Sequence, residues 1–359
     1  MRPRLRQLVQ RMVDEGTLSS DDAAALQRSL PKAAATDGSA PWYVRLLSAF
    51  GAWLAAALLA GFFVAAELFK HGGGALAFGL LLLAAACVVR SRVRNDFAVQ
   101  AALAAAVAGE ALVLVGADDA WHLRDQKLAL LALALNAAVV VALADPVGRF
   151  LASAFAVGCA LFVAYDERWE GLVILVLLLL GAGTLAVWLA PPSWGGARWR
   201  AIRPPLGVAL AAGFLGGLAL ILADHPWRDR SGDVLLTAGI TALAACLVAW
   251  ILRAHRGSLR SEAGIVALVG IVLLGAVGWR TPGIVGATAV LALGYHRREV
   301  VLFGLAIAAF VGFAGWYYYS LELTLLEKSG VLALSGAVAL GAREYLRRRH
   351  QPSQQGAPA

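Results

Sequence analysis

Long apolar blocks separated by short polar clusters are the feature that most limits what this chain can fold into. The blocks are about 13 to 22 residues long, are dominated by Leu and Ala, and lack the alternation of an amphipathic strand. At a rise of about 1.5 Å per residue, most of them match the hydrocarbon core of a bilayer, which is about 30 Å thick. Because backbone groups in lipid must be paired internally, each block should be helical. The sequence therefore predicts an all-α, polytopic transmembrane helical bundle.

The composition agrees with a membrane protein. Hydrophobic residues make up 60% of the 359 residues and charged residues only 15%, whereas a soluble domain carries about 25% charged residues. We predict about 12 spans, at 46–67, 73–89, 97–117, 127–144, 150–165, 170–190, 205–223, 234–252, 263–279, 283–295, 299–319 and 325–342. The tenth is the weakest, because it is short and follows Pro282 directly, and it is interpreted as a short or re-entrant helix.

The distribution of charge predicts how these spans are oriented. With both termini in the cytoplasm, the cytoplasmic segments hold 23 of the 31 Lys and Arg residues. Such a one-sided excess is typical of cytoplasmic loops in inserted membrane proteins. Removing or adding a span in the middle would reverse the pattern downstream, so the charges favour the count of twelve. Trp and Tyr side chains at the predicted ends of the spans are typical of the interfacial aromatic belts.

The segments outside the spans divide the chain into four parts. Residues 1–32 have the spacing of a short amphipathic helical hairpin on the cytoplasmic side, and residues 33–45 read as a linker. The transmembrane domain is expected over 46–342. Residues 343–359 begin with a basic cluster and end in a polar, disordered tail on the cytoplasmic side.

One ionisable residue lies well inside a predicted span. Glu110 is in the third span, and the nearest polar candidates are Gln100 in the same span and Asn136 in the fourth. An ionisable group within a membrane helix is a functional candidate by default, so a proton or cation path is one hypothesis. The other is that these side chains form hydrogen bonds between helices and hold the bundle together.

Several functions have no support in the sequence. No Gly-rich phosphate loop, nucleophile elbow or HExxH motif is present, and the loops are short, so an enzyme is not expected. The histidines of the outward loops, His71, His122 and His225, lack the spacing of a metal site, and no metal or cofactor is expected. The net charge of +8 is better explained by attraction to anionic lipid of the inner leaflet than by nucleic-acid binding.

Three stretches carry a resemblance to a known family. The run Tyr317-Tyr-Tyr-Ser-Leu-Glu-Leu-Thr-Leu-Leu-Glu-Lys-Ser329 precedes an apolar helix and Arg343. It resembles the YYxLxxTLLxKS-like signature of an uncharacterised bacterial polytopic membrane family that carries a domain of unknown function. The stretches 41–47 and 97–112 are similar to that family as well, so the resemblance covers most of residues 41–349. It implies a bacterial inner-membrane location and, because members are typically encoded beside a GDYXXLXY-motif protein, a possible partner.

Two main functional hypotheses follow. The leading one is a non-enzymatic scaffold or subunit of the inner membrane that works with a membrane-associated partner. The alternative is a secondary transporter of a small solute or ion with Glu110 in its path, since twelve spans and a short, Pro/Gly-marked helix are typical of transporters. A lipid-handling protein with a lateral groove is a third possibility, because apolar ligands leave no charged signature in a sequence.

Overall fold

The fold is described from a computed structural model. It covers residues 72–93, 96–123, 125–167, 169–191, 194–223, 230–254, 261–278 and 281–320, together with a few isolated positions. Over these ranges the regular structure is entirely helical. The helices are α4 (Gly72–Arg92), α5 (Asp96–Trp121), α6 (Asp125–Ala142), α7 (Pro146–Asp166), α8 (Glu170–Leu189), α9 (Gly196–Ala223), α10 (Arg230–Ala254), α11 (Glu262–Val277), α12 (Pro282–Arg297) and α13 (Val300–Ser320).

These helices coincide with ten of the predicted spans, from 73–89 to 299–319. Eight of the described helices are long and apolar enough to cross a membrane, namely α4 to α10 and α13. The other two, α11 and α12, have 16 residues each, so the predicted short tenth element is a short helix. The predictions for 1–32, 33–45, the spans 46–67 and 325–342, and the tail 343–359 fall outside the continuous described ranges.

The start of α9 differs from its predicted span. The span was expected to begin at residue 205, but the helix begins at Gly196 and continues through Pro204 and Pro205. The hydropathy pattern located only the apolar part, because the first two turns carry Arg198, Arg200 and Arg203. Helical hydrogen bonding does not require an apolar sequence, so α9 extends beyond the apolar block.

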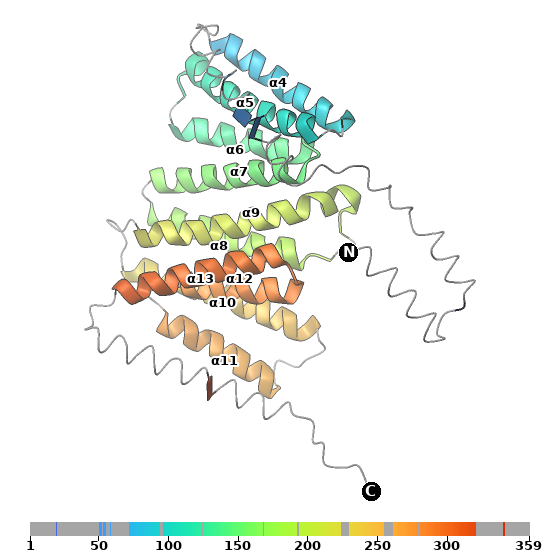
Figure 1. The fold of residues 1–359 in the computed structure, drawn as a ribbon. Coiled ribbons are helices and arrows are strands. Elements are labelled where there is room, and N and C mark those ends of the chain that lie inside the picture. The colour runs from blue at the N-terminus through green and yellow to red at the C-terminus, as the bar shows by residue number, and fades with distance from the viewer. Residues whose placement is uncertain are drawn as a thin grey trace.

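The helices form a row in which only α4 to α7 follow the order of the chain (Figure 1). Beyond α7, the row continues with α8 and α9, then α10, α12 and α13, and α11 lies at its far end. Short connections make consecutive helices antiparallel, and α7 and α9 run in parallel because α8 lies between them in sequence. Val157 of α7 lies against Gly213 of α9, and Leu161 lies against Gly217 four residues further along both helices. One buried cluster joins α4 to α7 with the start of α9, and a larger one joins α7, α8, α9, α10, α12 and α13.

Small residues allow two of the helices to approach very closely. A Cβ added at Gly79 of α4 would lie 2.7 Å from the carbonyl oxygen of Gly109 in α5. A Cβ at Gly109 would lie 2.8 Å from the carbonyl oxygen of Gly79 in return. Membrane helices gain stability from such close packing, because lipid supplies no hydrophobic drive for helices to associate.

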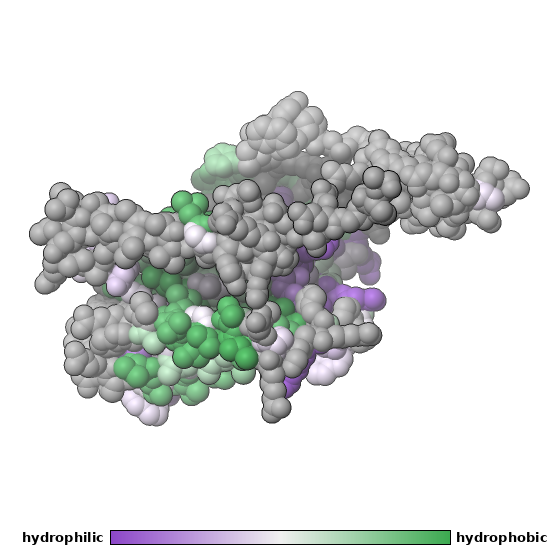
Figure 2. Space-filling view, turned by 90° about the horizontal axis from the view of Figure 1, so that it is seen from below, coloured by the Kyte–Doolittle hydropathy of each residue, from purple (hydrophilic) through white to green (hydrophobic). Residues whose placement is uncertain are grey.

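Basic side chains gather at one end of the bundle. Arg90 is in the last turn of α4, Arg253 in that of α10 and Arg297 in that of α12, and the first turns of α9 carry Arg198 and Arg200. In Figure 2, hydrophobic residues gather over the described part of the visible face and hydrophilic residues gather towards one side. The described helices thus have a membrane-like apolar body with a basic end.

Candidate polar site within the helices

Glu110 lies on the buried face of α5. Leu103, Ala106, Val113 and Ala117 follow the same spacing of three and four residues around it, and all are buried. Glu110 itself is only 8% exposed. Within the described residues, no hydrogen bond or ion pair reaches its carboxyl group. Glu110 thus places a polar side chain within a row of buried apolar residues along one face of α5.

Asn136 is buried in the next helix at a comparable depth. Glu110 lies 11 residues before the end of α5 at Trp121, and Asn136 lies 11 residues after the start of α6 at Asp125. In an antiparallel pair, both are therefore about 16 Å from that end. Asn136 is 2% exposed, and its Nδ2 donates to the carbonyl oxygen of Ala132 at 2.9 Å. Its Oδ1 atom is buried without a hydrogen-bond partner.

Ser153 of α7 extends this level to a third helix. Asn136 lies six residues before the end of α6 at Ala142, and Ser153 lies seven residues after the start of α7 at Pro146. Ser153 is 1% exposed, and its Oγ is buried without a hydrogen-bond partner. Sequence reasoning did not single out this serine. Residues that are equally far in sequence from the α6–α7 turn lie at the same depth in the two antiparallel helices. This symmetry about the turn was the signal that could have identified Ser153.

Gln100 does not belong to this level. It lies four residues after the start of α5 at Asp96, whereas Glu110 lies fourteen residues after it. The two positions are about 15 Å apart along the helix axis, and Gln100 is half-buried near the basic end. The structure shows no hydrogen bond among Glu110, Gln100 and Asn136. The three predicted residues thus separate into two at one depth and one near the end of the helix.

We call Glu110, Asn136 and Ser153 the polar level. It offers a carboxyl group, an amide oxygen and a hydroxyl group from three successive helices, each of them buried. An isolated charge in a membrane interior is costly, so this carboxyl group must hold a proton or accompany a cation. Among the described residues, no group of three or more His, Cys, Asp or Glu is placed to hold a metal ion.

A second polar arrangement fixes the basic end of α4, α6 and α7. Asp145 is the N-cap of α7, and its Oδ2 accepts a hydrogen bond from the Gly148 backbone N–H at 2.8 Å. Its Oδ1 accepts from Arg90 Nε at 3.0 Å and lies 3.0 Å from Arg90 Nη2. Arg149, 7% exposed, donates from Nε to the carbonyl oxygen of Val140 at 3.2 Å. These contacts tie three helices together. The sequence analysis placed Arg90, Asp145 and Arg149 only between predicted spans.

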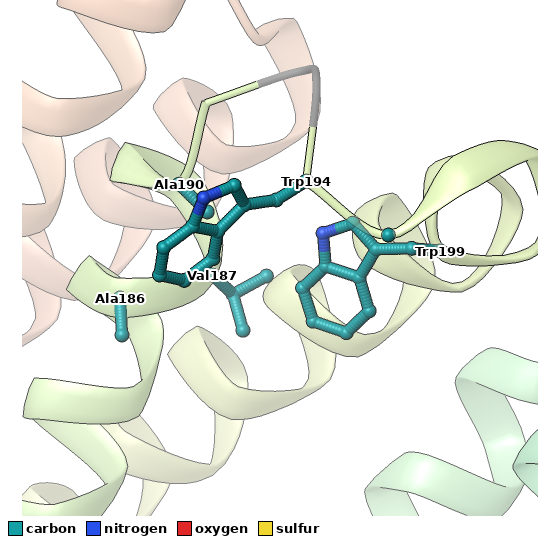
Figure 3. Close-up of a pocket in the computed structure, with 6 residues that line it drawn as sticks. Ala186, Val187, Ala190, Trp194 and Trp199 are labelled. Carbon is teal, nitrogen blue, oxygen red and sulfur yellow. The ribbon is translucent and has the colours of Figure 1, made fainter.

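An apolar pocket lies where α8 meets the start of α9. It is an open pocket with a volume of about 400 Å³, and its described lining is Ala186, Val187, Ala190, Trp194, Gly195 and Trp199. Figure 3 shows the indoles of Trp194 and Trp199 on either side of Val187. Gly195 and Gly196 have φ angles of 79° and 64°, a backbone conformation that side chains with a Cβ rarely adopt. We call this the indole pocket.

Arg203 of α9 binds the end of α8 beside the indole pocket. Its Nε donates to the Val187 carbonyl oxygen at 2.9 Å, and its Nη2 donates to that of Trp188 at 2.7 Å. The last carbonyls of α8 have no partner within their own helix, and a cation there is also favoured by the helix dipole. The guanidinium carbon lies 6.0 Å from the centre of the Trp188 ring. Arg203 thereby fixes the end of α8 against α9.

The fold and these sites define a multi-pass membrane protein made of a helical bundle. A family described as "Domain of unknown function (DUF4401)" matches residues 41–349. The chain belongs to this family, which agrees with the resemblance to a family with a domain of unknown function. No curated protein and no solved structure matches the chain.

Proposed function

We propose that the chain is a bacterial inner-membrane protein of about twelve spans with both termini in the cytoplasm, and that it is not an enzyme. The gathering of Arg residues at one end supports this orientation, because such residues are retained on the cytoplasmic side. The described helices are joined by connections of two to seven residues. Those connections leave little room for a catalytic domain, so the function is placed in the membrane helices or in a partner.

Within this frame, we propose that the polar level binds a proton or a small cation and that the protein transports it. The observation that carries the proposal is that Glu110 is buried and has no hydrogen bond or ion pair with another described residue. A structural role would favour a hydrogen bond between helices, and no described side chain supplies one to Glu110. Asn136 and Ser153 supply two further oxygen atoms at the same depth, and both are unpaired.

Ion flux into vesicles tests this proposal. The purified full chain is reconstituted into liposomes that contain a pH-sensitive dye, and flux is started by a pH or cation gradient. Glu110→Gln should lower the flux at least tenfold, while Asn136→Ala should lower it by a smaller factor. Asp118→Asn is the matched control, because Asp118 is an exposed carboxylate near the end of the same helix. Equal flux in wild-type and Glu110→Gln vesicles, above empty liposomes, excludes a role for Glu110 in the path.

A subunit or scaffold role with a GDYXXLXY-motif protein is the second proposal. The short connections favour it. With no soluble domain between the described helices, the chain would need another protein to interact with cytoplasmic components. Co-purification after extraction in mild detergent is the test, with the partner co-expressed and tagged. A reproducible complex of fixed stoichiometry supports the subunit role. A chain that is always recovered alone, with flux dependent on Glu110, favours the transporter.

A further inference from the structure

The indole pocket has no part in the polar level. It is formed by the last turn of α8, the connection that follows it and the first turn of α9, at the basic end of the bundle. Glu110, Asn136 and Ser153, in contrast, lie well inside their helices. Its volume of about 400 Å³ falls within the range of small-ligand sites, which is about 300–1,000 Å³. Its described lining consists of aliphatic side chains, one glycine and two indoles, so the ligand portion that enters must be apolar.

We propose that the indole pocket binds an acyl chain of an anionic phospholipid from the leaflet at the basic end, and that arginines beside the pocket hold the headgroup. Position gives the first argument. Indole rings favour the membrane–water interface, where their apolar bodies meet acyl chains and their N–H groups meet ester and phosphate oxygens. Ala186 and Trp194 are exposed on the outer surface, so the pocket is open to the surrounding lipid.

Charge gives the second argument. Arg198 and Arg200 directly flank Trp199 in the sequence, which places one on each side of it at about 100° around α9. Both are exposed. Arg203 is engaged with the carbonyls of Val187 and Trp188, whereas no hydrogen bond or ion pair with another described residue engages Arg198 or Arg200. Two cations beside an apolar pocket match the charge of a phosphodiester headgroup above an acyl chain.

An unpaired donor gives the third argument. The Nε1 atom of Trp199 is buried and has no hydrogen-bond partner, although a buried indole N–H usually finds one. In Figure 3 this nitrogen lies on the edge of the ring that faces Trp194. A carbonyl oxygen of a glycerol ester at the mouth of the pocket would accept this hydrogen bond. The backbone N–H groups of the first turn of α9, which begins at Gly196, add further attraction for a phosphate.

The shape of the pocket depends on the turn before α9. A Cβ added at Gly195 would lie 2.6 Å from the Cβ of Trp199, and the φ of 79° would be strained as well. Trp199 therefore lies over the bare Cα of Gly195, and the two indoles are held apart with room between them. A side chain at residue 195 would push Trp199 away and change the pocket.

Lipid retention measured by native mass spectrometry tests the proposal. The purified full chain is placed in detergent with equal amounts of phosphatidylglycerol and phosphatidylcholine of the same acyl chains, and bound lipids are counted as the detergent is raised. Wild type should retain one phosphatidylglycerol under conditions that remove other lipids. Ala186→Trp should abolish this retention by filling the pocket. Its control is Ala138→Trp, an exposed position near the same end of α6, which should retain the lipid.

Two further variants separate the headgroup from the acyl chain. Replacing both Arg198 and Arg200 by Gln should lower the preference for phosphatidylglycerol over phosphatidylcholine by about fivefold for each arginine, since one basic residue near a charged membrane surface contributes about 1 kcal/mol. Arg253→Gln, an exposed arginine at the same end, is the control and should leave the preference unchanged.

Three results would overturn the proposal. They are unchanged retention in Ala186→Trp, equal loss in Ala138→Trp, and equal binding of the two headgroups by wild type. The last two would show only the ordinary lipid layer around a membrane protein. These lipid-retention results are independent of whether Glu110 is required for ion flux.

Discussion

Asp145 is the residue whose loss should have the clearest structural effect, because it makes two different kinds of contact. Its Oδ2 caps α7 through the Gly148 N–H, and its Oδ1 pairs with Arg90 of α4. Loss of an N-cap costs about 0.5–2 kcal/mol. The ion pair is intermediate between surface pairs, worth about 0–1 kcal/mol, and fully buried ones, where removing one partner costs about 3–5 kcal/mol.

The exposure of the two partners sets the magnitude. The Asp145 side chain is 8% exposed and that of Arg90 is 23% exposed, so solvent screens the pair in part and about 1–2 kcal/mol is appropriate. Asp145→Ala should therefore lower the free energy of unfolding by about 1.5–4 kcal/mol, the sum of the cap and ion-pair contributions. Asp145→Asn keeps an oxygen that can accept the N-cap hydrogen bond, so it should lose only the contribution of the ion pair to the free energy of unfolding.

The assay is reversible unfolding of the full chain in mixed micelles, followed by tryptophan fluorescence. Adding Arg90→Gln completes a double-mutant cycle, and its coupling energy should be about 1–2 kcal/mol, in line with other contacting pairs. Asp118→Ala is the control, since it removes an exposed carboxylate near the end of α5. The reasoning fails if Asp145→Ala stays within about 0.5 kcal/mol of wild type, the range usual for surface substitutions, or if the cycle shows no coupling.

Two further predictions concern helix packing and use the same unfolding assay. Gly109→Ala should destabilise by about 1–3 kcal/mol, because its Cβ would lie 2.8 Å from the Gly79 carbonyl oxygen and must force α4 and α5 apart. Gly304→Ala should be neutral or stabilising, as nothing lies within 4 Å of its added Cβ, and equal effects in both variants would refute the close approach. Arg203→Gln should cost about 1.5–3 kcal/mol through its two charged hydrogen bonds to the end of α8, whereas an effect no larger than that of Arg253→Gln would contradict this role.

Sequence reasoning located the described helices but not how their side chains meet. Hydropathy depends on composition within one segment, so it found ten helices that match predicted spans. It placed the start of α9 nine residues late, because helix continues into Arg-rich sequence where hydropathy ends. It singled out Glu110 and Asn136 because a polar residue in an apolar block stands out, but the common depth became clear only from the bounds of α5 and α6.

The contacts of Asp145 and the indole pocket depend on how the helices meet in space, which no local sequence pattern indicates. Asp145 was assigned only as a charge between spans, since the hydrogen bonds of an N-cap depend on where α7 begins. The indole pocket requires the positive φ angles of Gly195 and Gly196 and the approach of α9 to α8. Trp194 and Trp199 lie between the predicted spans 170–190 and 205–223, and this turn is what brings both of them to one pocket.

The short helix α12 has a consequence for how the chain enters the membrane. At 16 residues it is about 24 Å long, less than the hydrocarbon thickness of about 30 Å. Half of its residues are buried, and it packs against α8, α9, α10 and α13. Only two residues separate it from α13. We therefore expect α12 and α13 to insert together as a hairpin, with α12 reaching its place only after the earlier helices have formed the surface that receives it.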